Sequence, residues 1–148
     1  MRTVLALTIL LATPAFAEEA GGLNWQPAKA WVRQPDRPMR AATYEVPAAK
    51  GDSEPAELAV FYFGQGQGGD VDANIRRWAG QFETPDGTPV TRTPKTRKLK
   101  VAGLPVTTVD VQGTYTASMG PMSPVKTKKP GYRLLGAIVE GPEGAVFF

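Results

Sequence analysis

The most specific chemical motif of this sequence is a run of glycine and glutamine. Residues 64–69 read Gly-Gln-Gly-Gln-Gly-Gly and satisfy the G-x-G-x-x-G pattern, whose tight turn leads into a helix start that binds phosphate. A dinucleotide site also needs an acidic residue about twenty positions further on, at the end of a parallel strand. Here that distance reaches only Glu83, and Asp70 and Asp72 would repel a phosphate. We therefore expect a flexible strand-to-helix connection and no bound cofactor.

The sequence contains no histidine and no cysteine. Thiolate nucleophiles, histidine bases, Ser-His triads, Cys/His metal sites and disulfides are therefore excluded. Carboxylate pairs such as Asp52 with Glu54, or Asp70 with Asp72, could serve a glycosidase or bind a cation. Solvated surface acids are the simpler interpretation, because Asp70 and Asp72 lack the rest of a calcium loop. A small carboxylate-dependent hydrolase or lyase is the alternative function, and the absence of catalytic groups favours a non-enzymatic protein.

Basic residues are concentrated in the second half of the chain. Residues 18–86 hold seven Lys or Arg against eleven Asp or Glu, a net charge of −4, whereas residues 87–139 hold nine against one, a net charge of +8. A basic half attracts anionic polymers, lipid surfaces or acidic proteins. We predict that an anionic partner binds through eight of these residues: Arg92, Lys95, Arg97, Lys98, Lys100, Lys126, Lys128 and Lys129.

A structural explanation of the same charges stays open. Lys98 and Lys100 alternate with Leu99 and Val101, as solvent-facing positions of a strand do. Lysines also protect an exposed strand edge from aggregation. No DNA- or RNA-binding motif accompanies the basic residues, so we expect no nucleic-acid partner.

Three tryptophans could form a carbohydrate-stacking surface. Trp78, however, fits the buried stripe of an expected helix, and Trp25 and Trp31 are more typical of lids over a core.

The N-terminus has the pattern of a secretory signal peptide. Arg2 gives a positive start, residues 4–12 are almost entirely apolar, and residues 15–17 read Ala-Phe-Ala, an A-x-A cleavage site. The apolar run has about half the ~20 residues that cross a bilayer as a helix, so we expect no transmembrane segment in the mature chain. We therefore predict that residues 1–17 are removed and that the protein is periplasmic or secreted.

The remaining residues are enough for one domain with its own core. We expect residues 18–24 to be a flexible lead-in and residues 25–148 to form a single domain. Without cysteine, its stability must come from packing alone.

Hydrophobic periodicity predicts two strands and a helix in the first half. Residues 40–46 alternate as a half-buried strand does, and residues 57–63 are apolar on both faces, as in a central strand. Four apolar residues then follow helical spacing, Asp70 precedes them as a cap, and Gly80 stands near the helix end. These residues are Val71, Ile75, Trp78 and Phe82.

The second half predicts two hairpins. Residues 91–101 and 107–115 alternate and form the first, and residues 117–130, with three prolines and three lysines, indicate a long loop. Residues 132–139 are apolar on both faces, and the turn at residues 141–144 leads into a returning strand. This order predicts an α+β fold, an antiparallel β-sheet with one amphipathic helix packed on it.

The printed sequence stops at Phe147 and Phe148, in the middle of the returning strand. Two aromatic residues at the end of a strand leave an apolar, unpaired edge. We therefore expect that the C-terminal part of the domain is missing or that something else covers this end.

Several short segments resemble an uncharacterised family of bacterial exported proteins. They are residues 39–44 (MRAATY), 59–64 (AVFYFG), 66–69 (GQGG), 74–78 (NIRRW) and 81–82 (QF). The resemblance extends over about residues 25–148, and the order of elements is similar to the Mog1/PsbP-like fold. It implies an α+β domain with no catalytic motif to transfer, and relatives of this kind continue into a final strand and a C-terminal helix.

The leading hypothesis is an exported, non-catalytic domain that binds a protein or an anionic envelope component through its basic half. A third hypothesis is a purely structural role in a larger assembly, which predicts co-purification with partners at fixed stoichiometry.

Overall fold

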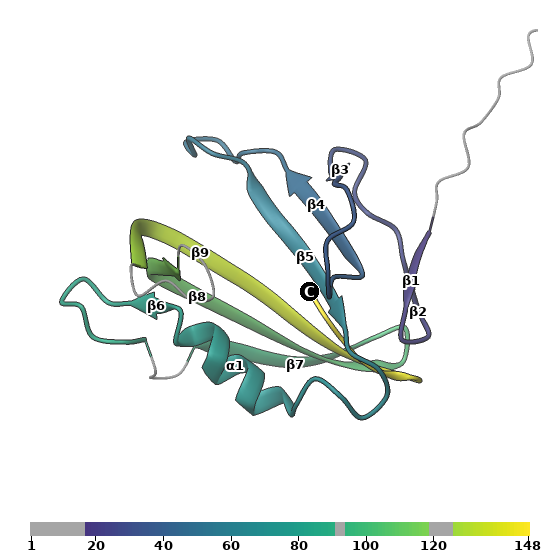
Figure 1. The fold of residues 1–148 in the computed structure, drawn as a ribbon. Coiled ribbons are helices and arrows are strands. Elements are labelled where there is room, and N and C mark those ends of the chain that lie inside the picture. The colour runs from purple at the N-terminus through teal and green to yellow at the C-terminus, as the bar shows by residue number, and fades with distance from the viewer. Residues whose placement is uncertain (1–16, 91–93, 119–125) are drawn as a thin grey trace, which may run out of the picture.

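The computed structural model describes residues 17–90, 94–118 and 126–148 (Figure 1). The described residues are mostly β, with 52% in strands and 8% in helix, and every pairing between the described strands is antiparallel. In chain order the elements are β1 (Glu18–Ala20), β2 (Leu23–Trp25), β3 (Val32–Arg33), β4 (Ala42–Val46), β5 (Ala56–Tyr62), α1 (Val71–Ala79), β6 (Phe82–Glu83), β7 (Lys95–Val101), β8 (Leu104–Ser118), β9 (Lys126–Gly141) and β10 (Gly144–Phe147).

The expectation of an α+β fold is therefore wrong. The described part of the chain holds one helix of nine residues, whereas β8 and β9 extend over 15 and 16 residues. Prolines and lysines predicted a loop over residues 117–130, of which residues 119–125 lie outside the described part of the chain. β8 instead continues to Ser118, and β9 begins at Lys126 and includes Pro130.

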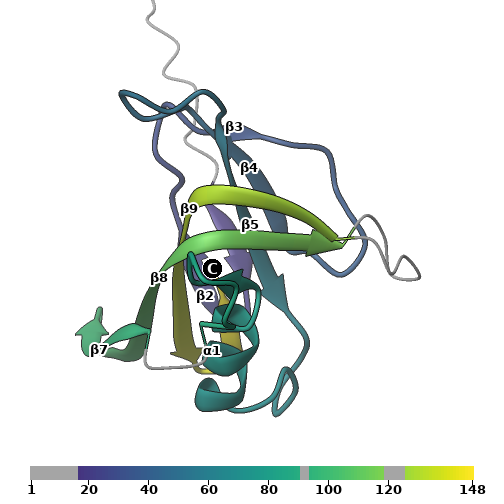
Figure 2. The ribbon, with the colours of Figure 1, turned by 90° about the vertical axis from the view of Figure 1, so that its left-hand side faces the viewer.

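Pro130 fits into β9 because the ladder is interrupted beside it. The β8–β9 register shifts between Gly113 and Tyr115, where Gly113 pairs with Tyr132 and Tyr115 with Lys129. Proline has no N–H to donate to a ladder, and bulges are among the few places in a sheet that accept it. A bulge also bends the strand pair, and Figure 2 shows β8 and β9 arching together.

The main sheet has the order β3-β4-β5-β10-β9-β8-β6, and β7 also pairs with β8. β10 therefore lies in the middle of the sheet, where Val146 and Phe147 pair with β5 on one side and with β9 on the other. Figure 1 shows the C-terminus between β5 and β9, which diverge on either side of it. This short strand alone joins the two halves of the described sheet.

Each face of the sheet carries its own core. α1 lies on one face, over a cluster that includes Phe82, Ile138 and Phe147. The opposite face buries Tyr44 and Val146 beneath side chains of β1 and β2. Because side chains alternate along a strand, the neighbours Val146 and Phe147 belong to different cores.

The β1–β2 hairpin occupies residues 18–25, most of which were expected to be a flexible lead-in. Trp25 lies edge-on to Phe148, with ring centroids 5.3 Å apart, and its Nε1 donates to the Tyr44 hydroxyl at 3.1 Å. Phe148 also exchanges two backbone hydrogen bonds of 2.8 Å with Ala137. The terminal aromatic residues are thus packed and partly paired, contrary to the expectation of a bare apolar edge.

The helix forms where its apolar spacing predicted it. Asp70 is its N-cap and accepts from the Ala73 amide at 2.7 Å, and Gly80 follows its last residue. Phe82 belongs to β6 and not to the helix, although it reaches the same core as Ile75. Among the residues that the structure describes, no helix has the length and apolar character needed to cross a bilayer.

Candidate functional site

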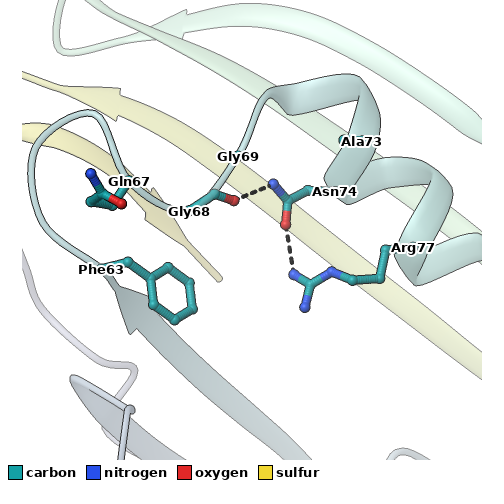
Figure 3. Close-up of a pocket in the computed structure, with 7 residues that line it drawn as sticks. All are labelled: Phe63, Gln67, Gly68, Gly69, Ala73, Asn74 and Arg77. Atoms are coloured by element: carbon teal, nitrogen blue, oxygen red, sulfur yellow. Dashed lines mark hydrogen bonds between the residues drawn. The ribbon is translucent and has the colours of Figure 1, made fainter.

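The glycine-rich segment borders a hollow of about 480 Å³ between the end of β5 and α1 (Figure 3). Asn74, in the first half of the helix, lines this hollow and is 3% exposed. The Asn74 side-chain amide donates to the carbonyl oxygens of Gly68 at 2.7 Å and of Asp70 at 3.0 Å, while its Oδ1 accepts from Arg77 at 2.6 Å. Asn74 thus fastens the loop to the helix with all its polar atoms.

The helix start is already occupied by a carboxylate. Asp70 accepts from the Ala73 amide through its side chain and from the Asn74 amide through its carbonyl oxygen. A phosphate at this place would meet a negative charge in the position it should take. Glycine is needed at position 68 for packing, since a Cβ there would lie 2.8 Å from the Phe147 ring. The G-x-G-x-x-G segment is therefore a structural connection.

The alternative function, carboxylate chemistry, needs either a cation site or a carboxyl group with a raised pKa. In the part of the chain that the structure describes, no group of three or more Asp and Glu side chains gathers as a cation site would require. Three carboxyl groups there have a displaced pKa, and in each case the pKa is lowered by hydrogen bonding: Glu54 beside Tyr132 and Lys129, Asp86 beside Thr84 and Thr88, and Asp110 beside Arg133. A general acid needs the opposite displacement.

The predicted basic site is divided among several places. Lys95 pairs with Asp110 and Arg97 pairs with Thr108, so Lys95 and Arg97 share a sheet face with these two residues of β8. Lys98 and Lys100 point to the opposite face, because side chains alternate along a strand.

Two of the other predicted residues, near the start of β9, form ion pairs. Lys128 contacts Glu83 at 2.7 Å, and Lys129 contacts Glu54 at 3.4 Å. Arg92 and the side chain of Lys126 lie outside the described part of the structure.

Lys98 lies near acidic side chains on the α1 side of the sheet. It borders a hollow of about 490 Å³ together with Asp70, Asp72 and Glu140. These three carboxylates offset its charge, so this side of β7 is not a net basic surface.

Three cations surround one carboxylate on the other side. Arg133 binds Asp110 through two parallel hydrogen bonds, Nε to Oδ1 at 2.8 Å and Nη2 to Oδ2 at 2.7 Å. These bonds lower the pKa of Asp110, and the nearby charges of Lys95 and Arg97 lower it further. We call Lys95, Arg97, Asp110 and Arg133 the Asp110 cluster; its formal charge is +2.

Exposed apolar side chains adjoin the Asp110 cluster on the same face. Leu135 pairs with Asp110 across the ladder and is 65% exposed, and Leu99 and Val101 follow Arg97 at alternate positions of β7. Sequence reasoning counted Arg133 in the charged half but did not place it in the site, and it missed Leu135 altogether. Both face solvent because the strand of residues 132–139 is covered on one face only.

The tryptophans do not form a ligand platform. Trp78 packs against Gly136, and Trp25 and Trp31 pack against the core around Tyr44.

Comparison with models of protein families, with curated proteins and with solved structures finds no match to this chain.

Proposed function

We propose that this protein is a non-catalytic binding module that recognises an acidic protein or another anionic envelope component through the Asp110 cluster. The observation that supports this proposal is the arrangement of Lys95, Arg97 and Arg133 around one carboxylate on an open sheet face. Asp110 holds the Arg133 guanidinium in place, and the side chains of Lys95 and Arg97 remain beside it to bind an anion. Leu99 and Leu135 supply apolar contact next to these charges.

The proposal includes export. Residues 1–17 would be removed as a signal peptide, and the module would act in the periplasm or outside the cell. N-terminal sequencing of the protein purified from its natural source tests this part. A chain that begins at Met1 in the cytosol would contradict it.

Salt dependence and a pair of matched variants test the binding surface. The probes are polyglutamate and vesicles that contain phosphatidylglycerol, with neutral phosphatidylcholine vesicles as the control. Binding to at least one anionic probe should weaken steeply between about 50 and about 500 mM NaCl, because exposed charges are screened over this range.

The variant Lys95→Glu with Arg97→Glu reverses two charges of the Asp110 cluster and should weaken binding about tenfold or more. The control is Lys98→Glu with Lys100→Glu, which makes the same charge change on the same strand but on the opposite face. Equal loss in both variants would show that net charge alone drives the interaction and would refute a site at Asp110.

A further inference from the structure

β7 forms an open edge of the main sheet in the part of the chain that the structure describes. It pairs with β8 along residues 95–101, and no described strand pairs with its other side. All seven of its residues are exposed. Figure 2 shows β7 at the margin of the molecule, outside β8. An edge of this kind presents unpaired N–H and C=O groups, to which another extended segment can bond.

The turn after β7 determines which of its backbone groups face outward. Ala102 and Gly103 have positive φ angles of 48° and 82°, as in a type I′ turn, and a two-residue turn of this type closes with its flanking residues as a hydrogen-bonded pair. Hydrogen-bonded and non-hydrogen-bonded pairs then alternate along the ladder. Pro105 fits this order, because it pairs with Lys100 and has no N–H to donate. Lys100 therefore turns its backbone groups away from β8.

Three residues of β7 thus have backbone groups that face outward. They are Thr96, Lys98 and Lys100, which alternate with residues bonded to β8. Among the described residues, no backbone hydrogen bond from another segment reaches these three. Their N–H and C=O groups form a row that one added strand would pair along its whole length.

The two faces of this edge differ in charge. On the face of the Asp110 cluster, Lys95 and Arg97 occupy alternate positions of β7, and Asp110 is already engaged by Arg133. On the α1 face, Lys98 borders a hollow together with three carboxylates. A carboxylate on an added strand would therefore be attracted on the first face and repelled on the second.

Two apolar residues continue the row that Lys95 and Arg97 begin. Leu99 is 42% exposed and Val101 is 53% exposed, and both lie on the face of the Asp110 cluster. Directly opposite residues of an antiparallel pair share a face and contact each other. An antiparallel segment that matches this face therefore carries two apolar side chains and then two carboxylates, all at alternate positions.

Charge selects the occupant of this edge. A second copy of β7 would bring four further cations against Lys95, Arg97, Lys98 and Lys100, and like charges across a strand pair are destabilising. A lipid headgroup would neutralise cations but would leave the outward N–H and C=O groups unpaired and Leu99 uncovered. An extended acidic segment of a protein matches the charges, the apolar side chains and the backbone groups together.

We propose that an extended acidic segment of a partner protein adds to the outer edge of β7 as an antiparallel strand. Two of its carboxylates lie opposite Lys95 and Arg97, two apolar side chains lie opposite Leu99 and Val101, and uncharged side chains take the positions between them. The direction is that of every described pairing in this sheet. This inference rests on the proposed function and specifies its partner.

Fluorescence anisotropy and amide hydrogen exchange test the proposal. The probe is the synthetic peptide Val-Thr-Val-Thr-Glu-Thr-Glu with capped ends, labelled with a fluorophore and added to the purified full chain. Anisotropy should show saturable binding that weakens between about 50 and about 500 mM NaCl. The amides of Thr96, Lys98 and Lys100 should gain protection from exchange, whereas those of Arg97 and Leu99, already bonded to β8, should change little.

Two control peptides carry the same charge as the probe. In the first, the last two threonines are replaced by proline, which removes two N–H groups from the ladder and keeps both glutamates. In the second, Val-Thr-Val-Glu-Thr-Glu-Thr, the glutamates move to the α1 face. Each control should bind about tenfold more weakly than the probe and should not protect the outward amides.

A charge exchange tests the register of the added strand. Arg97→Glu should weaken binding of the probe about tenfold, and replacing the first glutamate of the peptide by lysine should restore binding to this variant. Leu99→Ser should weaken binding of the probe about fivefold, because it removes apolar contact. Val32→Ser, a change at an exposed apolar position of the opposite edge strand β3, should leave binding unchanged.

Three outcomes would overturn strand addition at β7. Equal binding of the probe and both control peptides would leave an anionic surface without a paired strand. Binding of phosphatidylglycerol vesicles but not of the probe would make lipid the partner. Protection of Thr96, Lys98 and Lys100 without any peptide would show that this edge is already occupied. If polyglutamate, vesicles and peptide all fail to bind, the proposed function is refuted together with this inference.

Discussion

The indole ring of Trp78 lies directly on the backbone of Gly136. A Cβ at Gly136 would lie 2.5 Å from Cζ3 of this ring, a separation that packed side chains do not tolerate. This contact seats α1 on β9, in the half of the sheet that carries the Asp110 cluster. Other side chains of the same helix, Ile75 among them, are buried in the core cluster beneath it.

We expect Gly136→Ala to destabilise the protein by about 1–3 kcal/mol, because the added methyl group overpacks the contact with Trp78. Urea unfolding followed by tryptophan fluorescence gives the free energy of unfolding. The double variant Gly136→Ala with Trp78→Leu should lose less than the two single variants predict together, since a smaller side chain leaves room for the methyl group. Additive losses would show that the ring does not restrict this position.

Asn74→Ala should cost about 1–3 kcal/mol, because Asn74 is buried and its loss leaves the partly buried Gly68 carbonyl oxygen without its donor. Hydrogen exchange of residues 64–69 should accelerate at the same time. Gln67→Ala, a change in the same hollow at an exposed side chain, serves as the control and should change the unfolding free energy little. A loss in Asn74→Ala no larger than that of the control would contradict the fastening role of Asn74.

The Asp110–Arg133 pair should make stability depend on pH in the acidic range. The pKa of Asp110 is lowered in the folded protein, so the stabilisation is fully present above the ordinary aspartate pKa of about 3.9 and is lost as the pH falls through the lower folded value. Asp110→Asn should therefore lose less stability than the unchanged protein between about pH 5 and about pH 2. Asp52→Asn, at an exposed loop position, is the comparison. Parallel curves for Asp110→Asn and the unchanged protein would argue against this pair.

Lys98 and Lys100 should protect the outer edge of β7 from pairing with other molecules. All seven residues of β7 are exposed, and its other edge has no partner strand in the described part of the chain. We expect Lys98→Thr with Lys100→Thr to aggregate faster, because threonine favours strands and removes the repelling charges. Light scattering at fixed concentration measures the rate. The matched variant Lys128→Thr with Lys129→Thr removes the same charge elsewhere, and an equal increase would show that net charge, not this edge, sets the aggregation rate.

Local patterns predicted the elements whose side chains alone decide their structure. The strand of residues 40–46 appears as β4, and the apolar run of residues 57–63 appears as β5. The helix starts after its cap at Asp70 because capping and apolar spacing depend only on neighbouring residues. The strands of residues 107–115 and 132–139 appear within β8 and β9, but the extensions to Ser118 and from Lys126 were missed. Pro130 argued against a strand there, and the bulge that accommodates it is determined by the partner strand.

The sequence predicted that the candidate site would be basic, but it did not predict which residues would lie together. The sequence located the positive charge in residues 87–139 but assigned Lys95, Arg97, Lys98 and Lys100 to one site, although strand alternation places the first two and the last two on opposite faces of β7. It could not place Arg133 beside Asp110, because the β8–β9 register brings together residues that lie 23 positions apart.

Composition and short-range periodicity by themselves excluded histidine and cysteine chemistry and determined the helix, the strands of residues 40–46 and 57–63 and the surplus of positive charge. These properties depend on residue types and on neighbours within a few positions. Tertiary structure decided the mostly β fold, the place of β10 between β5 and β9, and the pairing of Arg133 with Asp110. Strand order and register are long-range choices, settled by which faces can be buried together, and no local pattern carries that information.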